Sequence, residues 1–475
     1  MSKGAIAVLL SEDLFDRIKV FQHGMHLDMR PLKALTPVSP GILQGCSHLT
    51  NECRAAMERI DALLTPWYAA HGTSRIPCLF RWFKHTYGVV ATHAAYFGKL
   101  ETLEYLHDVY TIRFFRDLPL WNVAAANGHL HVLGFLHTHL YVSYYQSAAL
   151  TCAGASGALA AVDWLHSHSI LCDIIDAQDM AAEFGQLEVL QWLHARGIGE
   201  ITTWGMDRAA KNGHIDVLAW LYDHTNVTCT TNAMDDAARN GHLDALEWLH
   251  AHQSKGATNA SVQYAAEHGH TDVVLWLLVH QPQMTKTALA MEAAAHRGHL
   301  EVVQALHDFG WPSTKRVMER AAAGGHLHVL QWLRANRTEG CTTAAMDDAA
   351  REGHLEVVQW LHEHYEKVGC SMDAMDSAAM RGHLEVVLWL HRHRREGCSD
   401  RGLFYAIQSG QLEMVQWFSR HRQEFNGAQK KEAGIQARRQ GHTAIAQYLE
   451  AAMPNECHCS DCGAMSAKQP SCCIS

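Results

Sequence analysis

A twelve-residue phrase that begins with glycine recurs, with variation, thirteen times along this chain of 475 residues, and its clearest copy is GHLEVVQWLHEH at Gly353–His364. Successive glycines lie 27 to 31 residues apart. So regular a period over most of a chain predicts a stack of similar units that bury residues against their neighbours, rather than a globule with one core. The thirteen glycines are Gly98, Gly128, Gly157, Gly185, Gly213, Gly241, Gly269, Gly298, Gly325, Gly353, Gly382, Gly410 and Gly441.

Each unit is predicted to contain two short helices joined at the glycine. In residues 232–252, apolar side chains follow helical spacing on both sides of Gly241, which ends the first helix because glycine adopts the left-handed conformation at little cost. Asp235 and Asp244 are expected near helix starts, where the helix dipole favours a carboxylate. No segment is rich in β-forming residues, so we expect an all-α solenoid of about thirteen helix-turn-helix repeats with a helical N-terminal cap. The expected buried positions of this unit are Met234, Ala237, Ala238, Leu243, Leu246, Trp248 and Leu249.

The repeated pattern A-A-x-x-G-H-L-E-V-V resembles the central motif of ankyrin repeats across residues 88–452. The units are shorter than the roughly 33 residues usual in that family. Met-Asp or Met-Glu, as at Met234-Asp235, stands where the family's T-P-L-H motif has Leu-His. The resemblance implies an ankyrin-like helical solenoid with plain loops in place of β-hairpin fingers. The W-L-H ending is similar to short ankyrin-type repeats of oomycetes and other protists.

The chain divides by pattern into an N-terminal helical region at 1–85, the repeat solenoid at 86–452 and a flexible cysteine-rich tail at 453–475. The first region lacks the repeat and is expected to cap the stack, since a terminal unit must shield an otherwise bare apolar face. Within it, Leu9–Phe21 resembles the first helix of an F-box, although the proline usual in that motif is missing and an ordinary amphipathic helix explains the residues equally well.

The tail ends in Cys472-Cys473-Ile474-Ser475, which fits the C-a-a-X signal and makes Cys472 the candidate for farnesylation. A single prenyl chain holds a protein at a membrane only marginally, so a second signal is needed. Palmitate on Cys457, Cys459 or Cys462 would supply it. Two alternatives stay open: a small zinc site formed by these three cysteines with Cys472, and a cysteine-rich tail with no modification.

Composition restricts the classes of partner and activity. A net charge of −10 argues against nucleic acid or anionic lipid as the main partner. There is no apolar run long enough to span a membrane, no secretory signal, and no Walker, Rossmann, nucleophile-elbow or kinase motif. We therefore expect a monomeric, non-enzymatic chain without catalytic residues, cofactor or metal. Its thiols should be reduced in the cytoplasm, with the tail as the one link to a membrane surface.

Histidine and tryptophan recur at fixed repeat positions, which favours packing over chemistry. Of 36 histidines, 25 follow the glycine directly or come nine or eleven residues later. His362 and His364 point to different sides of one helix and cannot share a metal ion. The histidine after the glycine is expected to cap the inter-helix turn. The aromatic ring seven residues after the glycine, as at Trp360, is expected to form an interior ladder between second helices rather than a stacking platform for ligands.

The residues that vary between units predict the recognition surface. The positions five and two residues before the glycine lie off the Met/Ala/Ala face of the first helix, the helix that lines the concave, protein-binding surface in the ankyrin family. The residues of a solvent-exposed face that binds nothing would also vary from unit to unit, through neutral substitution. We expect a scaffold that binds a partner protein there; the alternative is a ubiquitin-ligase substrate receptor with an F-box-like N-terminus. The candidate contact residues are Arg208, Lys211, Asp236, Arg239, Tyr264, Glu267, Arg320, Asp348, Arg351 and Ser377.

Overall fold

The computed structural model describes residues 27–35, 51–110, 118–139, 148–170, 176–253, 255–421 and 427–451. Within these ranges every regular element is a helix, which confirms the predicted all-α solenoid. Contacts divide the chain into two compact units, Met1–Ser261 and Val262–Ser475, which are described separately below. Among the described helices, none combines the length and the apolar character needed to cross a bilayer.

Thirteen helix pairs surround the thirteen glycines in the described part of the chain. The first compact unit contains the pairs α5 (Thr86–Tyr96) and α6 (Leu100–Val109), α7 (Leu120–Ala126) and α8 (Leu130–Thr138), α9 (Ala149–Ser156) and α10 (Leu159–Ser167), α11 (Ala177–Glu183) and α12 (Leu187–Ala195), α13 (Thr203–Lys211) and α14 (Ile215–His224), and α15 (Thr231–Asn240) and α16 (Leu243–His252).

The second compact unit begins inside α17 (Asn259–His268) and repeats the same pairing to the end of the described chain. It comprises the rest of α17 with α18 (Thr271–His280), α19 (Leu289–Arg297) with α20 (Leu300–Asp308), α21 (Lys315–Ala323) with α22 (Leu327–Asn336), α23 (Thr343–Glu352) with α24 (Leu355–His364), α25 (Met372–Arg381) with α26 (Leu384–His393), α27 (Asp400–Gln408) with α28 (Leu412–His421), and α29 (Gly427–Arg439) with α30 (Thr443–Ala451).

Within the described residues, five further helical segments precede the first pair. They are η1 (Leu27–Met29), η2 (Pro31–Ala34), α3 (Asn51–His71), η5 (Thr73–Arg75) and α4 (Ile76–Trp82). Helix α3 packs against α5, where the Asp61 carboxylate lies 2.9 Å from Nε2 of the fully buried His93. Burial by itself would raise the pKa of Asp61, but hydrogen bonds from Thr65 and His93 and the charge of Lys99 lower it. This cluster joins the N-terminal helices to the first repeat.

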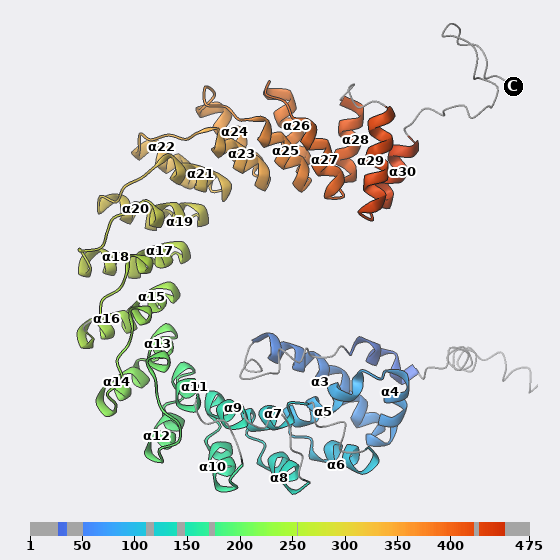
Figure 1. Ribbon diagram of the computed structural model, residues 1–475, viewed down its shortest axis with the longest axis vertical. Coiled ribbons are helices and arrows are strands. Elements are labelled where there is room, and N and C mark those ends of the chain that lie inside the picture. The colour runs from blue at the N-terminus through green and yellow to red at the C-terminus, as the bar shows by residue number, and fades with distance from the viewer. Residues whose placement is uncertain are drawn as a thin grey trace, which may run out of the picture. The chain divides into compact units, whose positions relative to one another are not determined.

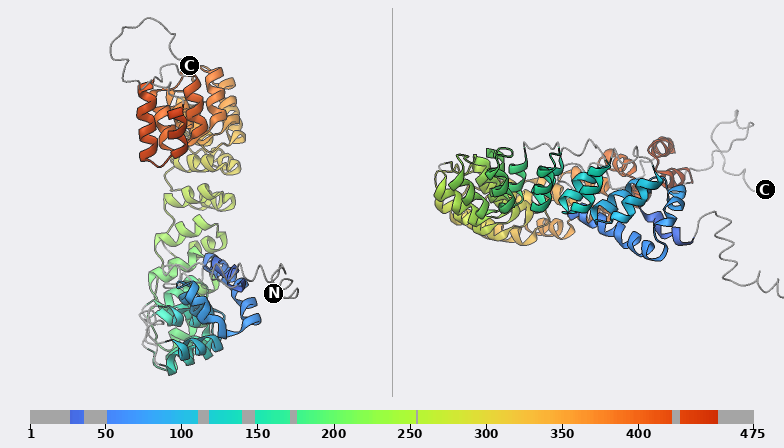
Figure 2. Two further views of the ribbon diagram at one scale, coloured as in Figure 1. Left: turned by 90° about the vertical axis from the view of Figure 1, so that its right-hand side faces the viewer. Right: turned by 90° about the horizontal axis from the view of Figure 1, so that it is seen from below.

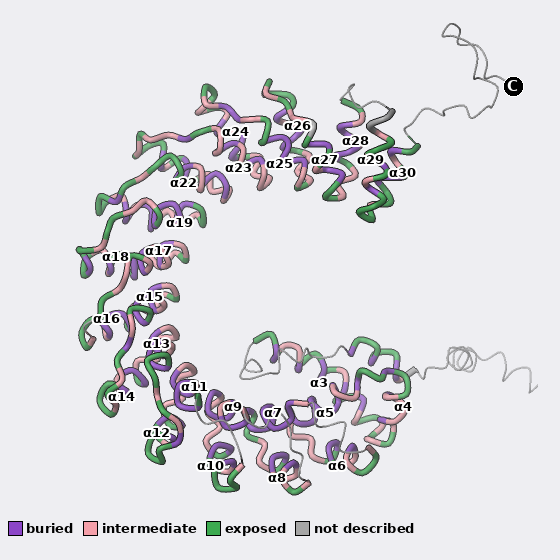
Figure 3. Tube along the Cα trace, in the orientation of Figure 1, coloured by how far each residue is buried: buried purple, intermediate pink, exposed green. Residues whose placement is uncertain are grey.

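In both compact units the odd-numbered first helices form one layer and the even-numbered second helices form another (Figures 1 and 2). Successive first helices pack much more closely than successive second helices. Figure 3 shows that buried residues gather in the first helices, while the outward turns of the second helices are exposed. Alanines explain the difference: Ala237 and Ala238 on α15 are fully buried, and their small side chains let neighbouring backbones approach.

The turn inside each pair has the predicted glycine geometry. All thirteen glycines have φ between 67° and 84°, the left-handed region. At Gly241 the amide N–H donates to the Ala238 carbonyl, and the next amide, of His242, donates to the Ala237 carbonyl at 3.0 Å. These bonds satisfy carbonyls at the end of the first helix, as in other glycine-terminated helices. The prediction that glycine ends the first helix is confirmed.

The histidine after the glycine does not cap its own turn, contrary to expectation. The Nε2 atom of His354 lies 3.2 Å from the Ala323 carbonyl oxygen of the preceding unit, and His299 and His326 make equivalent bonds to Glu267 and His296. Each ring also lies directly over the preceding unit's glycine. The histidine is therefore a link between units, and the glycine is needed both for its backbone conformation and for the space it leaves.

The acidic residue six positions before the glycine is a second link that the sequence did not reveal. Asp235 is only 7% exposed and lies in the middle of α15, so the predicted role at a helix start is wrong. Its two carboxylate oxygens accept bonds from the Thr258 backbone N–H at 2.8 Å and from the Thr258 hydroxyl at 2.6 Å. Burial raises the pKa of Asp235, and the Thr258 bonds partly offset that effect.

The same carboxylate–hydroxyl link recurs along the stack, and its hydroxyl comes from the residue that caps the next first helix. Thr230, for example, accepts from the Asn232 N–H as N-cap while its own hydroxyl donates to Asp207. The further pairs are Asp179–Thr202, Glu292–Thr314, Glu319–Thr342, Asp347–Ser371 and Asp376–Ser399.

Replacing Asp235 with alanine is expected to lower the free energy of unfolding by about 1–3 kcal/mol, because the part-buried Thr258 N–H and hydroxyl lose their acceptor. Urea denaturation followed by circular dichroism measures the change. Asp244→Ala is the control in the same unit, since Asp244 is exposed in the first turn of α16. Equal losses in the two variants would contradict a specific role for the link.

The tryptophan ladder between second helices exists, but it is less interior than predicted. Only Trp360 and Trp417 are buried, at 9% and 7% exposure, and the others are half-buried. Histidines cover the rest of the rings. His364 stacks on Trp360 of its own helix with ring centres 4.7 Å apart, and His362 meets the edge of Trp389 in the next unit at 5.2 Å. The ladder is thus an alternation of indole and imidazole rings along the second-helix layer.

Acidification is expected to destabilise the stack between pH 7.5 and 5.5. Burial is the main cause that lowers the pKa of His299, His326 and His383. Because the folded pKa lies below the unfolded value of about 6.5, the unfolded chain binds more protons in this range, and the free energy of unfolding falls as the pH falls. Melting temperatures at pH 7.5, 6.5 and 5.5 measure this. The His326→Gln variant should show a weaker pH dependence, and an unchanged slope would contradict the assignment.

Candidate protein-binding surface

The ten candidate contact residues all lie on first helices and are half-buried. Their neighbours in sequence, the Met/Ala/Ala residues such as Met206, Ala209 and Ala210 on α13, are fully buried, as predicted. The constant residues of the unit therefore hold the helices together, and the ten variable ones are half-buried positions of the first helices. We call the part of the first-helix layer (Figure 1) that carries these ten residues the first-helix face.

In the first compact unit, α13 presents an exposed aromatic ring beside a cation. Trp204 is 41% exposed, and the Arg208 guanidinium lies 5.0 Å from the centre of its ring. Arg208 also lies 3.9 Å from Glu183 of α11, so two successive first helices share it. On the next helix, α15, Arg239 pairs with Asp236 at 3.3 Å. Lys211 is half-buried on the same helix as Trp204.

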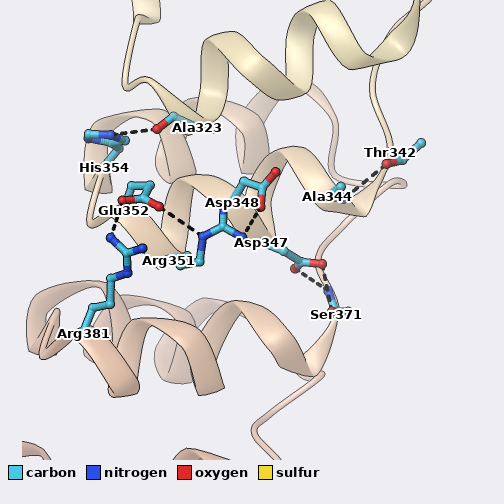
Figure 4. Close-up of polar contacts among 10 residues, drawn as sticks. All are labelled: Ala323, Thr342, Ala344, Asp347, Asp348, Arg351, Glu352, His354, Ser371 and Arg381. Atoms are coloured by element: carbon cyan, nitrogen blue, oxygen red, sulfur yellow. Dashed lines mark hydrogen bonds and ion pairs between the residues drawn. The ribbon is translucent and has the colours of Figure 1, made fainter. Parts of the chain in front are cut away.

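In the second compact unit, α23 and α25 carry a chain of ion pairs (Figure 4). Arg351 lies 2.9 Å from Asp348 and 3.1 Å from Glu352, and Glu352 accepts from Arg381 of the next first helix at 2.7 Å. These pairs are partly solvated, so each adds little to stability. They do hold long side chains in defined positions, which lowers the entropy that a partner must remove on binding.

The other candidates of the second compact unit differ in how they are engaged. Glu267 pairs with Arg297 of the next first helix at 3.4 Å. Arg320 has no ion pair within the described residues, and the adjacent Glu319 carboxylate accepts the Thr342 hydroxyl at 2.6 Å. Tyr264 and Ser377 are half-buried on α17 and α25.

Trp204, Glu352 and Arg381 belong to this face but were missed from the sequence. Trp204 lies nine residues before Gly213, outside the two positions that were compared between units. An aromatic residue there is exceptional, since the equivalent residues of neighbouring units are Asn232 and Ala260. Comparing every exposed position of the first helix would have found it. Glu352 and Arg381 directly precede their glycines, and only the structure shows that they join candidate residues of adjacent units.

Several predicted sites fall outside the described residues. Leu9–Phe21 precedes them, and the candidate lipidation residues Cys457, Cys459, Cys462 and Cys472 follow them. Cys341 and Cys370 are buried free thiols, and burial raises the pKa of each to about 11, which favours the protonated thiol over the thiolate. The described residues contain no cluster of three or more histidine, cysteine, aspartate or glutamate side chains that could hold a metal ion.

Comparison with known proteins identifies the repeat. Residues 206–250 and 346–391 match a family model of ankyrin repeats in many copies, and residues 237–315 match a model of three ankyrin repeats. No curated protein matches the chain.

Similar solved structures include the maize pentatricopeptide repeat protein PPR10, at 12% identity over 93% of this chain and 73% of that one, with a TM-score of 0.32. The same protein in complex with an 18-nucleotide psaJ RNA element shows 11% identity over 88% and 72% of the two chains, with a TM-score of 0.35. Likenesses at this level carry no inference about function. The chain therefore carries ankyrin repeats: the family models match them at residues 206–315 and 346–391, and the glycine turns and helix pairs of the other described units follow the same plan.

Proposed function

We propose that this protein is an interaction scaffold that binds a partner protein through its first-helix face. The observation that supports this proposal most is that the buried residues of each unit recur while its half-buried residues vary. Alanine and methionine recur at buried positions, whereas the half-buried residues of the same helix differ from unit to unit. Repeat stacks present extended surfaces of this kind to their partners.

Trp204 and Arg208 are the proposed centre of the contact in the first compact unit. Tryptophan and arginine dominate the energetics of protein interfaces, because a large ring and a planar cation contribute much contact area. Trp204 is exposed although it lies beside a well-packed layer, and Arg208 is held against it by the ring and by Glu183. Burial of this pair by a partner would recover apolar area that the isolated chain leaves in water.

A double variant, Trp204→Ala with Arg208→Ala, is expected to weaken partner binding about tenfold or more, as loss of a hot spot does. The measurement is affinity capture from a cell lysate with quantitative mass spectrometry, comparing each captured protein between the parent and the variant. Tyr222→Ala is the matched control, because Tyr222 is an exposed aromatic residue on the second helix of the same unit, with 47% exposure.

The melting temperatures of the parent, the double variant and Tyr222→Ala are compared to check that the fold is retained. Support for the proposal is a partner that is lost from the double variant and kept by Tyr222→Ala. Partners kept equally by both variants would contradict the first-helix face as the binding surface. If a partner is lost only from Tyr222→Ala, the result would indicate that the binding surface lies on the second-helix layer instead.

A further inference from the structure

Histidines at the ends of successive second helices approach one another across the units. His421, at the end of α28, stacks on Trp417 with ring centres 4.9 Å apart, and His391 of α26 contacts the edges of both rings. The centres of the two imidazole rings lie 5.8 Å apart. The first compact unit repeats this arrangement, with His137 of α8 and His168 after α10 at 5.6 Å. The sequence excluded a metal shared within one helix, but these pairs lie between helices.

The hydrogen bond of one histidine in each pair fixes which nitrogen carries the proton. Nδ1 of His421 lies 3.0 Å from the Trp417 carbonyl oxygen, and Nδ1 of His168 lies 2.8 Å from the Trp164 carbonyl oxygen. A carbonyl only accepts, so Nδ1–H is the donor and Nε2 keeps its lone pair in the neutral ring. Metal-binding histidines are commonly oriented in this way, by a bond from the other ring nitrogen to a carbonyl.

The separation of the rings matches two imidazoles on one metal ion. A zinc–nitrogen distance of 2.0–2.1 Å in tetrahedral geometry places two ring centres roughly 5–6 Å apart. Two other pairs in the same register do not meet this condition. His107 and His139 are too close, at 4.3 Å, and His362 and His393 lie 6.4 Å apart. The repeat register alone therefore does not create the site.

The His362 ring is also engaged elsewhere, because the Arg394 guanidinium donates to its Nδ1. No hydrogen bond to either nitrogen of His391 or His137 is present within the described residues. In both well-spaced pairs, the histidine without the carbonyl bond, His391 or His137, is therefore not hydrogen-bonded to another described side chain.

We propose that His391 with His421, and His137 with His168, each bind one zinc ion between two successive second helices. The described residues offer no third protein ligand there, so water would complete the tetrahedral coordination, and zinc is an ion that imidazole ligands suit. Each ion would join two neighbouring repeats on the layer opposite to the first-helix face. The site is distinct from the proposed protein-binding surface.

The test is titration of the full-length chain with zinc chloride at pH 7.5, measured by isothermal calorimetry. The five tail cysteines, Cys457, Cys459, Cys462, Cys472 and Cys473, are first replaced by serine so that thiolates do not compete. Relative to this background, His391→Gln and His137→Gln are each expected to remove one equivalent of bound zinc, and the double variant two. Zinc should also raise the melting temperature of the background protein, and the double variant should lose that increase.

His252→Gln is the matched control, because His252 stacks on Trp248 in the same way but faces Tyr222 instead of a second histidine. It is expected to bind as much zinc as the background. The proposal is overturned if His391→Gln and His137→Gln retain the full stoichiometry, or if His252→Gln loses as much as they do. Melting temperatures without metal distinguish lost binding from lost folding: a variant that no longer folds is replaced by His421→Gln or His168→Gln of the same pair.

Discussion

Trp360→Ala is expected to lower the free energy of unfolding by about 3–5 kcal/mol, as truncation of a buried aromatic ring does. Trp360 is 9% exposed, stacks on His364 and contacts Tyr365, so the substitution removes the ring from the gap between second helices and leaves a cavity. Urea denaturation of the full chain, followed by circular dichroism, measures the loss. A repeat stack can unfold in parts, and the transition nearest α24 is the one expected to shift.

Trp332→Ala is the matched control for this prediction. Trp332 occupies the same repeat position in the preceding unit, but it is half-buried and meets His307 only at its edge. Because less of its surface leaves water on folding, its loss should cost clearly less than that of Trp360. Equal effects at the two positions would mean that the ladder stabilises the stack independently of burial, and an unchanged transition in Trp360→Ala would refute the prediction.

Gly353→Ala is expected to cost about 2–5 kcal/mol through two separable effects. The backbone at Gly353 has φ +84°, which strains any residue that carries a Cβ atom. That Cβ would in addition lie 2.6 Å from Nδ1 of His383, the linking histidine of the next unit, so the ring must move and its bond to the preceding unit is disturbed. Urea denaturation is again the measurement.

Gly441 separates the two effects, because it has the same φ of +84° but nothing within 4 Å of an added Cβ. Gly441→Ala should therefore show the backbone strain alone, and Gly353→Ala the strain and the clash together. If both variants lose the same stability, the contact between the glycine and the next histidine contributes nothing. A larger loss at Gly353 supports the glycine as part of the link between units.

The period of the sequence was sufficient to predict the helix pairs, because it reports directly on residues that must be buried in every unit. Gly241 and the alanines of α15 illustrate this: their sizes and spacing have only one good explanation in a helical stack. The candidate first-helix face followed from the same comparison, since the positions that change are those that the packing leaves free.

The links between units could not be predicted, because spacing within a unit says nothing about which atoms meet across the interface. Asp235 was predicted to lie near a helix start, and only its contact with Thr258 shows that it is a buried hydrogen-bond acceptor. The histidine after the glycine was predicted to cap the inter-helix turn, whereas it hydrogen-bonds to a carbonyl of the previous unit. Trp204 was missed for a different reason. It departs from the repeat pattern in one unit only, and recurring residues are the signal from which the other positions were predicted.

Six repeats, those of Gly213, Gly241, Gly298, Gly325, Gly353 and Gly382, carry both a histidine after the glycine and a carboxylate six residues before it. In such a repeat the histidine contacts the preceding unit and the carboxylate contacts the hydroxyl of the next one. A whole repeat cut out between two glycines would therefore leave matching ends. If residues 326–353 were removed, His354 would follow Gly325 and Glu319 would meet Ser371, another hydroxyl at the same repeat position. Evolution can lengthen or shorten such a chain by copying or deleting whole repeats, and so change the extent of its recognition surface without redesigning the bonds that hold it together.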